Sequence, residues 1–176
     1  YVEFENLKVP KENLLHNSDE GYKHQLLARA WFRINIAAMG VGGMQACLEE
    51  SIAYAKKRVA FGKPIAGFQL VQELISDIAM DTDILRLLVY RASCLLDKGI
   101  RSDIEQSMSK VFCGEAAVRV AHKAIQVFGA RGLTTDEGYK LERFYRDSIM
   151  GGIGEGTTQI LKLLIGRRLT GIQAFI

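Results

Sequence analysis

Apolar residues recur at helical spacing in three long stretches of the chain. The first stretch, residues 29–57, carries apolar or small residues three and four positions apart: Phe32, Ile36, Met39, Gly43, Ala46, Cys47, Ile52 and Ala55. We expect a short helix from about Gly21 to lead into this long one. Because glycine weakens a helix, Gly40, Gly42 and Gly43 predict close packing against a neighbouring helix.

The second stretch follows a break at Phe61–Pro64 and begins near Phe68 or Gln69. Its apolar stripe consists of Val71, Leu74, Ile75, Ile78, Leu85, Leu88, Val89, Ala92 and Leu95. Lys98 and Gly99 provide a typical helix stop.

The third stretch runs to about Phe128, and Ser102 and Asp103 are typical of the region that caps a helix N-terminus. Its apolar face includes Met108, Val111, Phe112, Ala116, Val120 and Ala124. An irregular segment, Gly129–Gly138, should lead to a short helix at about Lys140–Ile149 and a last helix at about Thr157–Leu169.

Long helices with short connections predict an all-α fold, an antiparallel four-helix-type bundle. Residues Tyr1–Glu5 alternate like a half-buried strand, yet no second strand pattern follows. Since a lone strand cannot satisfy its own hydrogen bonds, we interpret residues 1–18 as the end of an upstream β-domain and a linker. Residues 19–176 then form the helical bundle domain.

Composition excludes several classes of function. The 176 residues are 48% hydrophobic and carry a net charge of +3 without clustered Lys or Arg, which argues against nucleic-acid binding. No apolar run is long enough to span a bilayer. Isolated cysteines (Cys47, Cys94, Cys113) are typical of reduced core residues, and scattered histidines (His16, His24, His122) predict no metal site.

One carboxylate, Glu155, lies between Gly154 and Gly156, directly before the last helix. Small neighbours let a ligand lie against the carboxylate, and apolar surroundings make it a better general base. From the loop alone, a surface glutamate in a glycine-rich turn is the favoured interpretation. No parallel-sheet pattern surrounds the glycines, so a dinucleotide-binding fingerprint is rejected.

Five motifs appear together and in order: Arg58–Ile65, Phe68–Gln72, Gln126–Gly129, Glu142–Asp147 and Glu155–Thr157. In this order and spacing, the chain resembles the C-terminal domain of the acyl-CoA dehydrogenases over almost its whole length. The resemblance implies FAD-dependent α,β-dehydrogenation of an acyl-CoA thioester. Glu155 would remove the Cα proton while a hydride passes from Cβ to the flavin.

The resemblance also implies roles for other residues. The cofactor-binding positions would be Arg58, Phe61, Phe68, Gln69, Gln126, Gly129, Thr157 and Gln159, and the substrate positions Arg33, Gly154 and Gly156. In the family, the cofactor contacts from Arg58 to Gly129 come largely from a neighbouring subunit, which implies a homo-oligomer, a dimer or tetramer. Some members place the base in the long first helix, where this chain has Arg33. The charged residues of Glu142–Asp147 would form a structural ion-pair cluster.

Two departures from the family pattern matter. Ala130 and Arg131 follow Gly129 where a second glycine is common, so the cofactor contact there would differ. Gly154 stands where many members carry tyrosine, which predicts tolerance of branched or bulky acyl groups.

Alternatives stay open at this point. The electron acceptor would be an electron-transferring flavoprotein, but a flavin-dependent acyl oxidase or a dehydrogenase of carrier-bound acyl groups would share the bundle. A non-catalytic helical oligomerisation module is the third possibility, and keeping Glu155, Arg58 and Gln126 together argues against it.

Overall fold

The computed structural model describes residues 1–15, 20–135 and 139–174. This part of the chain contains the helices α1 (Gly21–Lys57), α2 (Gln69–Asp97), α3 (Asp103–Phe128), α4 (Leu141–Ser148) and α5 (Thr158–Thr170). Single 3-10 turns connect them at Ile65–Gly67, Gly129–Leu133 and Ile149–Gly152. The prediction of an all-α bundle is confirmed.

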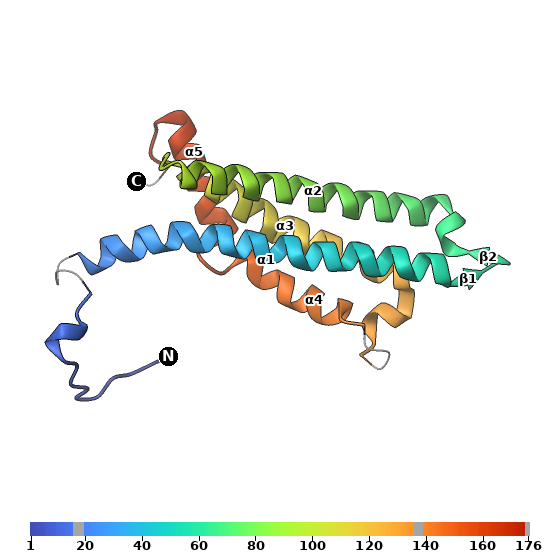
Figure 1. Cartoon of the computed structure of the whole chain (residues 1–176), viewed down its shortest axis with the longest axis horizontal. Coiled ribbons are helices and arrows are strands. Elements are labelled where there is room, and N and C mark those ends of the chain that lie inside the picture. The colour runs from blue at the N-terminus through green and yellow to red at the C-terminus, as the bar shows by residue number, and fades with distance from the viewer. Residues whose placement is uncertain (16–19, 136–138, 175–176) are drawn as a thin grey trace.

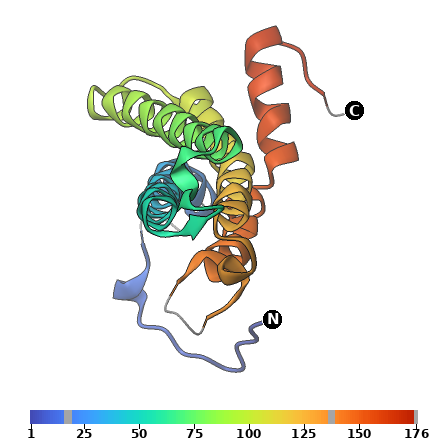
Figure 2. The ribbon, with the colours of Figure 1, turned by 90° about the vertical axis from the view of Figure 1, so that its right-hand side faces the viewer.

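The helix α3 lies at the centre of the bundle and packs against α1, α2, α4 and α5. Figure 1 shows α1 and α2 running side by side, with α3 behind them and α4 along the lower edge. Seen end-on in Figure 2, α5 stands on the side of α3 away from α1 and α2. Many buried residues of α3 are small, including Ser107, Ser109, Gly114, Ala117 and Ala121, which lets several helices approach it closely.

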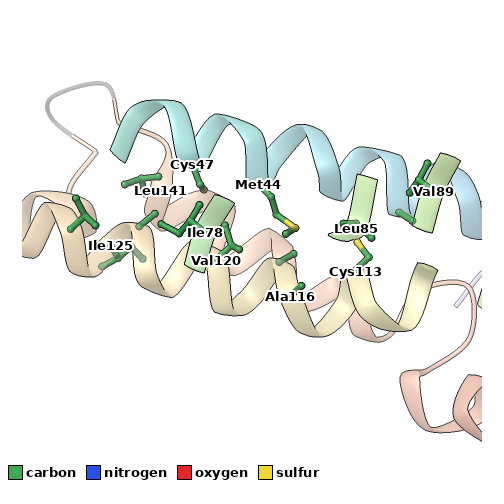
Figure 3. Close-up of a cluster of buried hydrophobic side chains, with 14 of the residues drawn as sticks. Met44, Cys47, Ile78, Leu85, Val89, Cys113, Ala116, Val120, Ile125 and Leu141 are labelled. Carbon is green, nitrogen blue, oxygen red and sulfur yellow. The ribbon is translucent and has the colours of Figure 1, made fainter. Parts of the chain in front are cut away.

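The core lies where α1, α2 and α3 meet (Figure 3). Met44, Ile78, Leu85 and Val120 are completely buried there. The predicted stripe of α2 is confirmed, because its buried residues include Ile78, Leu85, Val89 and Ala92. The prediction for α1 is partly wrong, since Phe32 and Met39 are 52% and 70% exposed.

Glycine packing differs between neighbouring positions of α1. A Cβ added to Gly40 would lie 2.3 Å from the sulfur of Cys113, and one added to Gly43 would lie 1.9 Å from the ring of Phe144. A Cβ at Gly42 would meet nothing within 4 Å. The predicted close packing is therefore confirmed for Gly40 and Gly43 and wrong for Gly42.

Between α1 and α2 the chain makes a short hairpin of β1 (Val59–Ala60) and β2 (Lys63–Pro64). Val59 pairs with Pro64, and Ala60 with Lys63. Both turn residues have positive φ, 50° at Phe61 and 79° at Gly62, which matches the twist of a two-residue hairpin turn. This hairpin is the break that the sequence places at Phe61–Pro64.

The N-terminal segment corrects one prediction. Residues 1–15 are described and contain no strand, only a 3-10 turn at Lys11–Asn13. Tyr1–Glu5 is exposed and pairs with no other described segment. Because a strand is defined by its hydrogen bonds to a neighbouring strand, an extended segment without such a partner is not a strand. The proposed domain boundary after residue 18, and His16, lie outside the described residues.

Three further corrections concern details. The helix α1 runs without interruption from Gly21, so the short leading helix is not separate. Cys47 and Cys113 are buried and free, whereas Cys94, predicted in the core, is exposed on α2. Ser102 is the N-cap of α3, but its hydroxyl accepts from Gln106 Nε2 instead of a backbone N–H.

Candidate active site and cofactor-binding end

Glu155 sits on a strained turn between α4 and α5. Its φ is 55°, the left-handed region that side chains other than glycine rarely adopt, and Gly156 follows with a φ of 101°. Such a conformation costs about 1–3 kcal/mol and persists only where the surroundings fix it. It is the local feature that places a single carboxylate at the end of the Gly151–Gly156 loop.

The start of α5 is capped directly after Glu155. Thr157 is the N-cap residue, and its hydroxyl accepts a hydrogen bond from the Ile160 amide at 3.4 Å. Thr158 Oγ1 donates to the Gly152 carbonyl at 3.3 Å, which ties the helix start back to the loop. Gln159, the other predicted contact on this side, is exposed on the first turn.

The loop lies directly on α3. A Cβ added to Gly114 would lie 2.8 Å from the Gly151 carbonyl oxygen and 2.9 Å from the Gly152 Cα, so only glycine allows this approach. One helical turn earlier, Lys110 Nζ donates to the Gly156 carbonyl at 2.5 Å. Neither Gly114 nor Lys110 is among the site residues predicted from the sequence.

The carboxylate and the first part of α1 form a hollow of about 290 Å³, lined by Gln25, Ala28, Arg29, Phe32, Glu155 and Gly156. It is open, and it brings together a carboxylate, an arginine and an aromatic ring. Glu155 and Gly156 therefore line the same hollow, and Gly154 is adjacent in the loop. The hollow is a place where a polar group could lie against Glu155.

Arg33 does not line this hollow. It lines a neighbouring one of about 710 Å³ between α1, the end of α2, the start of α3 and α5. Burial lowers the pKa of Arg33, nearby Arg29 lowers it further, and Glu155 opposes the shift. Its Nε is buried and has no hydrogen-bond partner among the described residues. The charge of Glu155 therefore acts on the Arg33 guanidinium, although Arg33 does not line the Glu155 hollow.

A second group of predicted residues meets at the opposite end of α1. Arg58, Gln126 and Gly129 line a hollow of about 460 Å³ together with Tyr54, Ile65, Val127, Phe128, Ala130 and Arg131. The rings of Tyr54 and Phe128 stack at 4.1 Å and form its floor. The side chains of Arg58 and Gln126 are exposed, so their polar ends are available to a ligand.

Gly129 ends α3 with a φ of 63° and a ψ of −140°, a conformation that only glycine adopts readily. The neighbouring Ala130 and Arg131 continue into a 3-10 turn and are both exposed. Arg131 therefore adds a second cation to the rim of this hollow, at the position where the sequence departs from the family pattern.

The aromatic residues of the hairpin form a separate contact. The rings of Phe61 and Phe68 meet edge to face with centroids 6.1 Å apart, and Lys63 Nζ lies 4.4 Å from the centre of the Phe68 ring. Phe61 is 96% exposed and Gln69 is exposed on the first turn of α2. Phe61 and Gln69 are thus uncovered, whereas Phe68 is half-buried between Phe61 and Lys63.

The two hollows lie far apart on one chain. Phe32 lines the first and Tyr54 the second, and both belong to the uninterrupted helix α1. At about 1.5 Å of rise per residue they are separated by about 33 Å, about the diameter of a small domain. A ligand pocket of ordinary size cannot include both.

The ion pairs predicted on α4 are present. Arg146 Nε donates to Glu142 at 2.9 Å, and Arg143 Nε donates to Asp147 at 3.3 Å. The hydrogen bond from Arg146 lowers the pKa of Glu142. All four residues pair within one short helix, as expected of a local structural cluster.

Two absences apply to the described residues. No group of three or more His, Cys, Asp or Glu side chains there could hold a metal ion. None of the helices in that part of the chain combines the length and apolar character needed to cross a membrane.

The comparisons with known proteins decide the family. The family model described as "Acyl-CoA dehydrogenase, C-terminal domain" matches residues 19–170. The chain belongs to the acyl-CoA dehydrogenase family. The match covers every helix from α1 to α5 and both hollows.

Two curated relatives illustrate the similarity. A probable acyl-CoA dehydrogenase of Bacillus subtilis, YngJ, is 41% identical over 94% of this chain and 43% of its own length. The caffeyl-CoA reductase-Etf complex subunit CarC of Acetobacterium woodii is 37% identical over 94% of this chain and 43% of its own length.

Solved structures share the fold. The glutaryl-coenzyme A dehydrogenase glutaryl-CoA complex superimposes with a TM-score of 0.89 at 36% identity, over 96% of this chain and 42% of that one. PigA with FAD and proline gives 0.87 at 32% identity, and the prolyl acyl carrier protein oxidase AnaB gives 0.87 at 30%. Each of these two covers 94% of this chain and 43% of its own. The chain thus spans less than half the length of the proteins that it matches.

Proposed function

We propose that the chain is the C-terminal helical domain of a FAD-dependent acyl-CoA dehydrogenase and that Glu155 is its catalytic base. The observation that carries the proposal is the placement of Glu155. A single carboxylate is held on a strained turn, beside a hollow, and its side chain makes no hydrogen bond or ion pair with any described residue.

The chemistry required of this chain is proton removal. A thioester lying in the Glu155 hollow would present the acidic Cα–H to the carboxylate, which takes that proton. The electron pair of the broken Cα–H bond would form the Cα=Cβ π bond as a hydride leaves Cβ with its own electron pair, and bound FAD would supply the acceptor for that hydride. Phe32 and the backbone of Gly156 would limit water around the acyl group.

The residues at the far end of α1 fit a dinucleotide. Arg58 and Arg131 offer cations for a pyrophosphate, Gln126 offers amide donors and acceptors, and the exposed ring of Phe61 beside the half-buried ring of Phe68 offers apolar area. Thr157 and Gln159 would contact the flavin from the Glu155 side. Thr157 Oγ already accepts from Ile160, so its hydroxyl proton remains free to donate.

The separation of the two hollows supports a homo-oligomer. About 33 Å of α1 lies between them, so Glu155 and Arg58 of one chain would serve two different flavin sites. A second observation agrees: Met80, Ile84 and Leu87 form an exposed apolar stripe along the outer face of α2. We propose that a second copy of this chain covers that stripe and that each flavin site is shared between copies.

The substrate and the electron acceptor are proposals at family level. Acyl-CoA is the substrate class, as in the glutaryl-CoA complex, and an electron-transferring flavoprotein is the acceptor, in line with the Etf complex to which CarC belongs. Similarity to an acyl carrier protein oxidase favours a second candidate, the oxidation of carrier-bound acyl groups.

The test is anaerobic titration of the full-length protein with a panel of acyl-CoA thioesters while the flavin absorbance is followed. We expect bleaching by some thioesters and a loss of about 10²–10⁴ in the bleaching rate for Glu155→Gln. Glu115→Gln, on α3 and paired with Lys162, is the matched control and should bleach like the parent.

Each other outcome contradicts a stated part of the proposal. Equal bleaching by Glu155→Gln and the parent would remove Glu155 as the base. Bound flavin that no thioester bleaches would point to carrier-bound substrates. A full-length protein without flavin would point to a non-catalytic helical module.

A further inference from the structure

A lysine is completely buried beside the loop that carries Glu155. Lys110 lies in the middle of α3 and has no exposed surface. Lysine is among the residue types that are almost never fully buried without a partner. A fully buried ammonium therefore calls for a specific partner.

The partner of Lys110 is a backbone group of the loop. Nζ donates to the carbonyl of Gly156, which is 46 residues away in sequence, at 2.5 Å. Within the described part of the chain this is its only hydrogen bond. The ammonium therefore contacts the peptide unit that joins Gly156 to Thr157, and it contacts no carboxylate among the described residues.

Lys110 and Gly114 hold the two ends of the loop. They are four residues apart and lie on the same face of α3. Gly114 meets the backbone of Gly151 and Gly152, and Lys110 meets Gly156. The segment between these two contacts contains Glu155 in its left-handed conformation.

The charges in this region influence one another. Burial lowers the pKa of Lys110, Arg33 lowers it further, and Glu155 opposes the shift. Arg33 is influenced by the same carboxylate. Two cations from α1 and α3 thus lie near one loop carboxylate.

We propose that Lys110 is a positioning residue for Glu155: its hydrogen bond to the Gly156 carbonyl fixes the backbone turn that aims the carboxylate at the substrate. This inference rests on the proposed role of Glu155 as the base. Lys110 lines neither hollow, so the proposal gives a residue of α3 a role in the reaction without direct contact with a ligand in either hollow.

The test compares Lys110→Met with Lys123→Met in the full-length protein. Methionine is unbranched and only one atom shorter than lysine, and it removes the donor and the charge. Lys123 is the matched control because it lies on the same helix and pairs with Asp77 at 2.6 Å, away from the loop. Stopped-flow flavin reduction gives the limiting rate and the substrate Kd separately, and hydrogen exchange reports on the amides of residues 153–157.

For Lys110→Met we expect retained flavin, faster exchange in residues 153–157, and a limiting rate about 100-fold lower, with the substrate Kd changed less than about threefold. Lys110→Gln keeps an N–H donor and should recover part of the rate. Lys123→Met should match the parent in all three measurements.

Several results would overturn the inference. An unchanged rate in Lys110→Met, while Glu155→Gln remains inactive, would reject the role of Lys110 and leave the proposed function intact. An active Glu155→Gln would instead reject the proposed function. Failure of both Lys110 variants to fold would also count against it, because the lysine would then hold the bundle and not the loop.

Discussion

The residues of the two proposed sites, one near each end of α1, are held in place in different ways. At the Glu155 end, backbone strain, a glycine contact and a buried lysine fix one charged side chain on a loop. At the Arg58 end, the stacked rings of Tyr54 and Phe128 form a firm floor, while Arg58 and Gln126 extend from helices with their polar ends exposed. Proton transfer needs one exact direction, whereas anchoring a long anionic cofactor needs several adaptable polar contacts.

For FAD binding, the largest effect that separates the two ends is expected from Arg58→Ala. Loss of charge-assisted hydrogen bonds should weaken FAD binding roughly 10- to 150-fold. A fluorescence titration of the apoprotein of the full-length chain measures this. Lys57→Ala, one residue earlier and exposed, is the control. Glu155→Gln should bind FAD as tightly as the parent, and weaker binding by it would erase the distinction between the ends.

Gly114→Ala tests how firmly the loop end is held. The new Cβ would lie 2.8 Å from the Gly151 carbonyl oxygen, so either the loop or α3 must move. We expect the free energy of unfolding to fall by about 1–3 kcal/mol and flavin reduction to slow, with FAD binding unchanged.

The control for this variant is Gly42→Ala on α1, where a Cβ meets nothing within 4 Å. It should stabilise the protein by about 0.5–1 kcal/mol. Denaturant unfolding measures both variants. Equal stabilities of the two alanine variants would contradict the close contact between the loop and α3.

The smallest effect is expected from Gly154→Tyr. A Cβ there would lie 3.6 Å from the Met150 carbonyl oxygen and meet nothing closer, so a ring can extend from the loop toward the acyl group. We expect the ratio of kcat/KM for straight-chain over branched thioesters to rise about tenfold. An unchanged ratio would mean that Gly154 does not set the width of the substrate site.

Much of the fold follows from local signals in the sequence. Gly99 and Gly129, both with positive φ, end α2 and α3 where glycine predicts an end, and the break at Phe61–Pro64 is the hairpin. The exposure of individual side chains is harder to predict, because helical spacing identifies an apolar stripe on a helix but not which neighbouring helices cover that stripe. Cys94 and Met39 are apolar residues on helices, and the described part of the chain leaves both exposed.

The loop residue Glu155 could be proposed from its glycine neighbours and from the family motif. The supporting residues could not, because Lys110 and Gly114 act through contacts with residues about 40 positions away. One signal was available: small residues such as Ser107, Ser109 and Cys113 flank Lys110 in the sequence, which is typical of a helix segment with other segments packed closely around it. A lysine within such a helix has to find a partner inside the protein.

The most direct test of the central claim is subunit complementation. The Glu155→Gln and Arg58→Ala forms of the full-length protein are unfolded together, refolded as a mixture with FAD, and assayed for flavin reduction by acyl-CoA. If Glu155 and Arg58 of one chain serve different flavin sites, mixed dimers contain one intact site, and the mixture should recover about a quarter of the parent activity. Activity no greater than the sum of the two separate variants would place both residues in the same site and contradict the account.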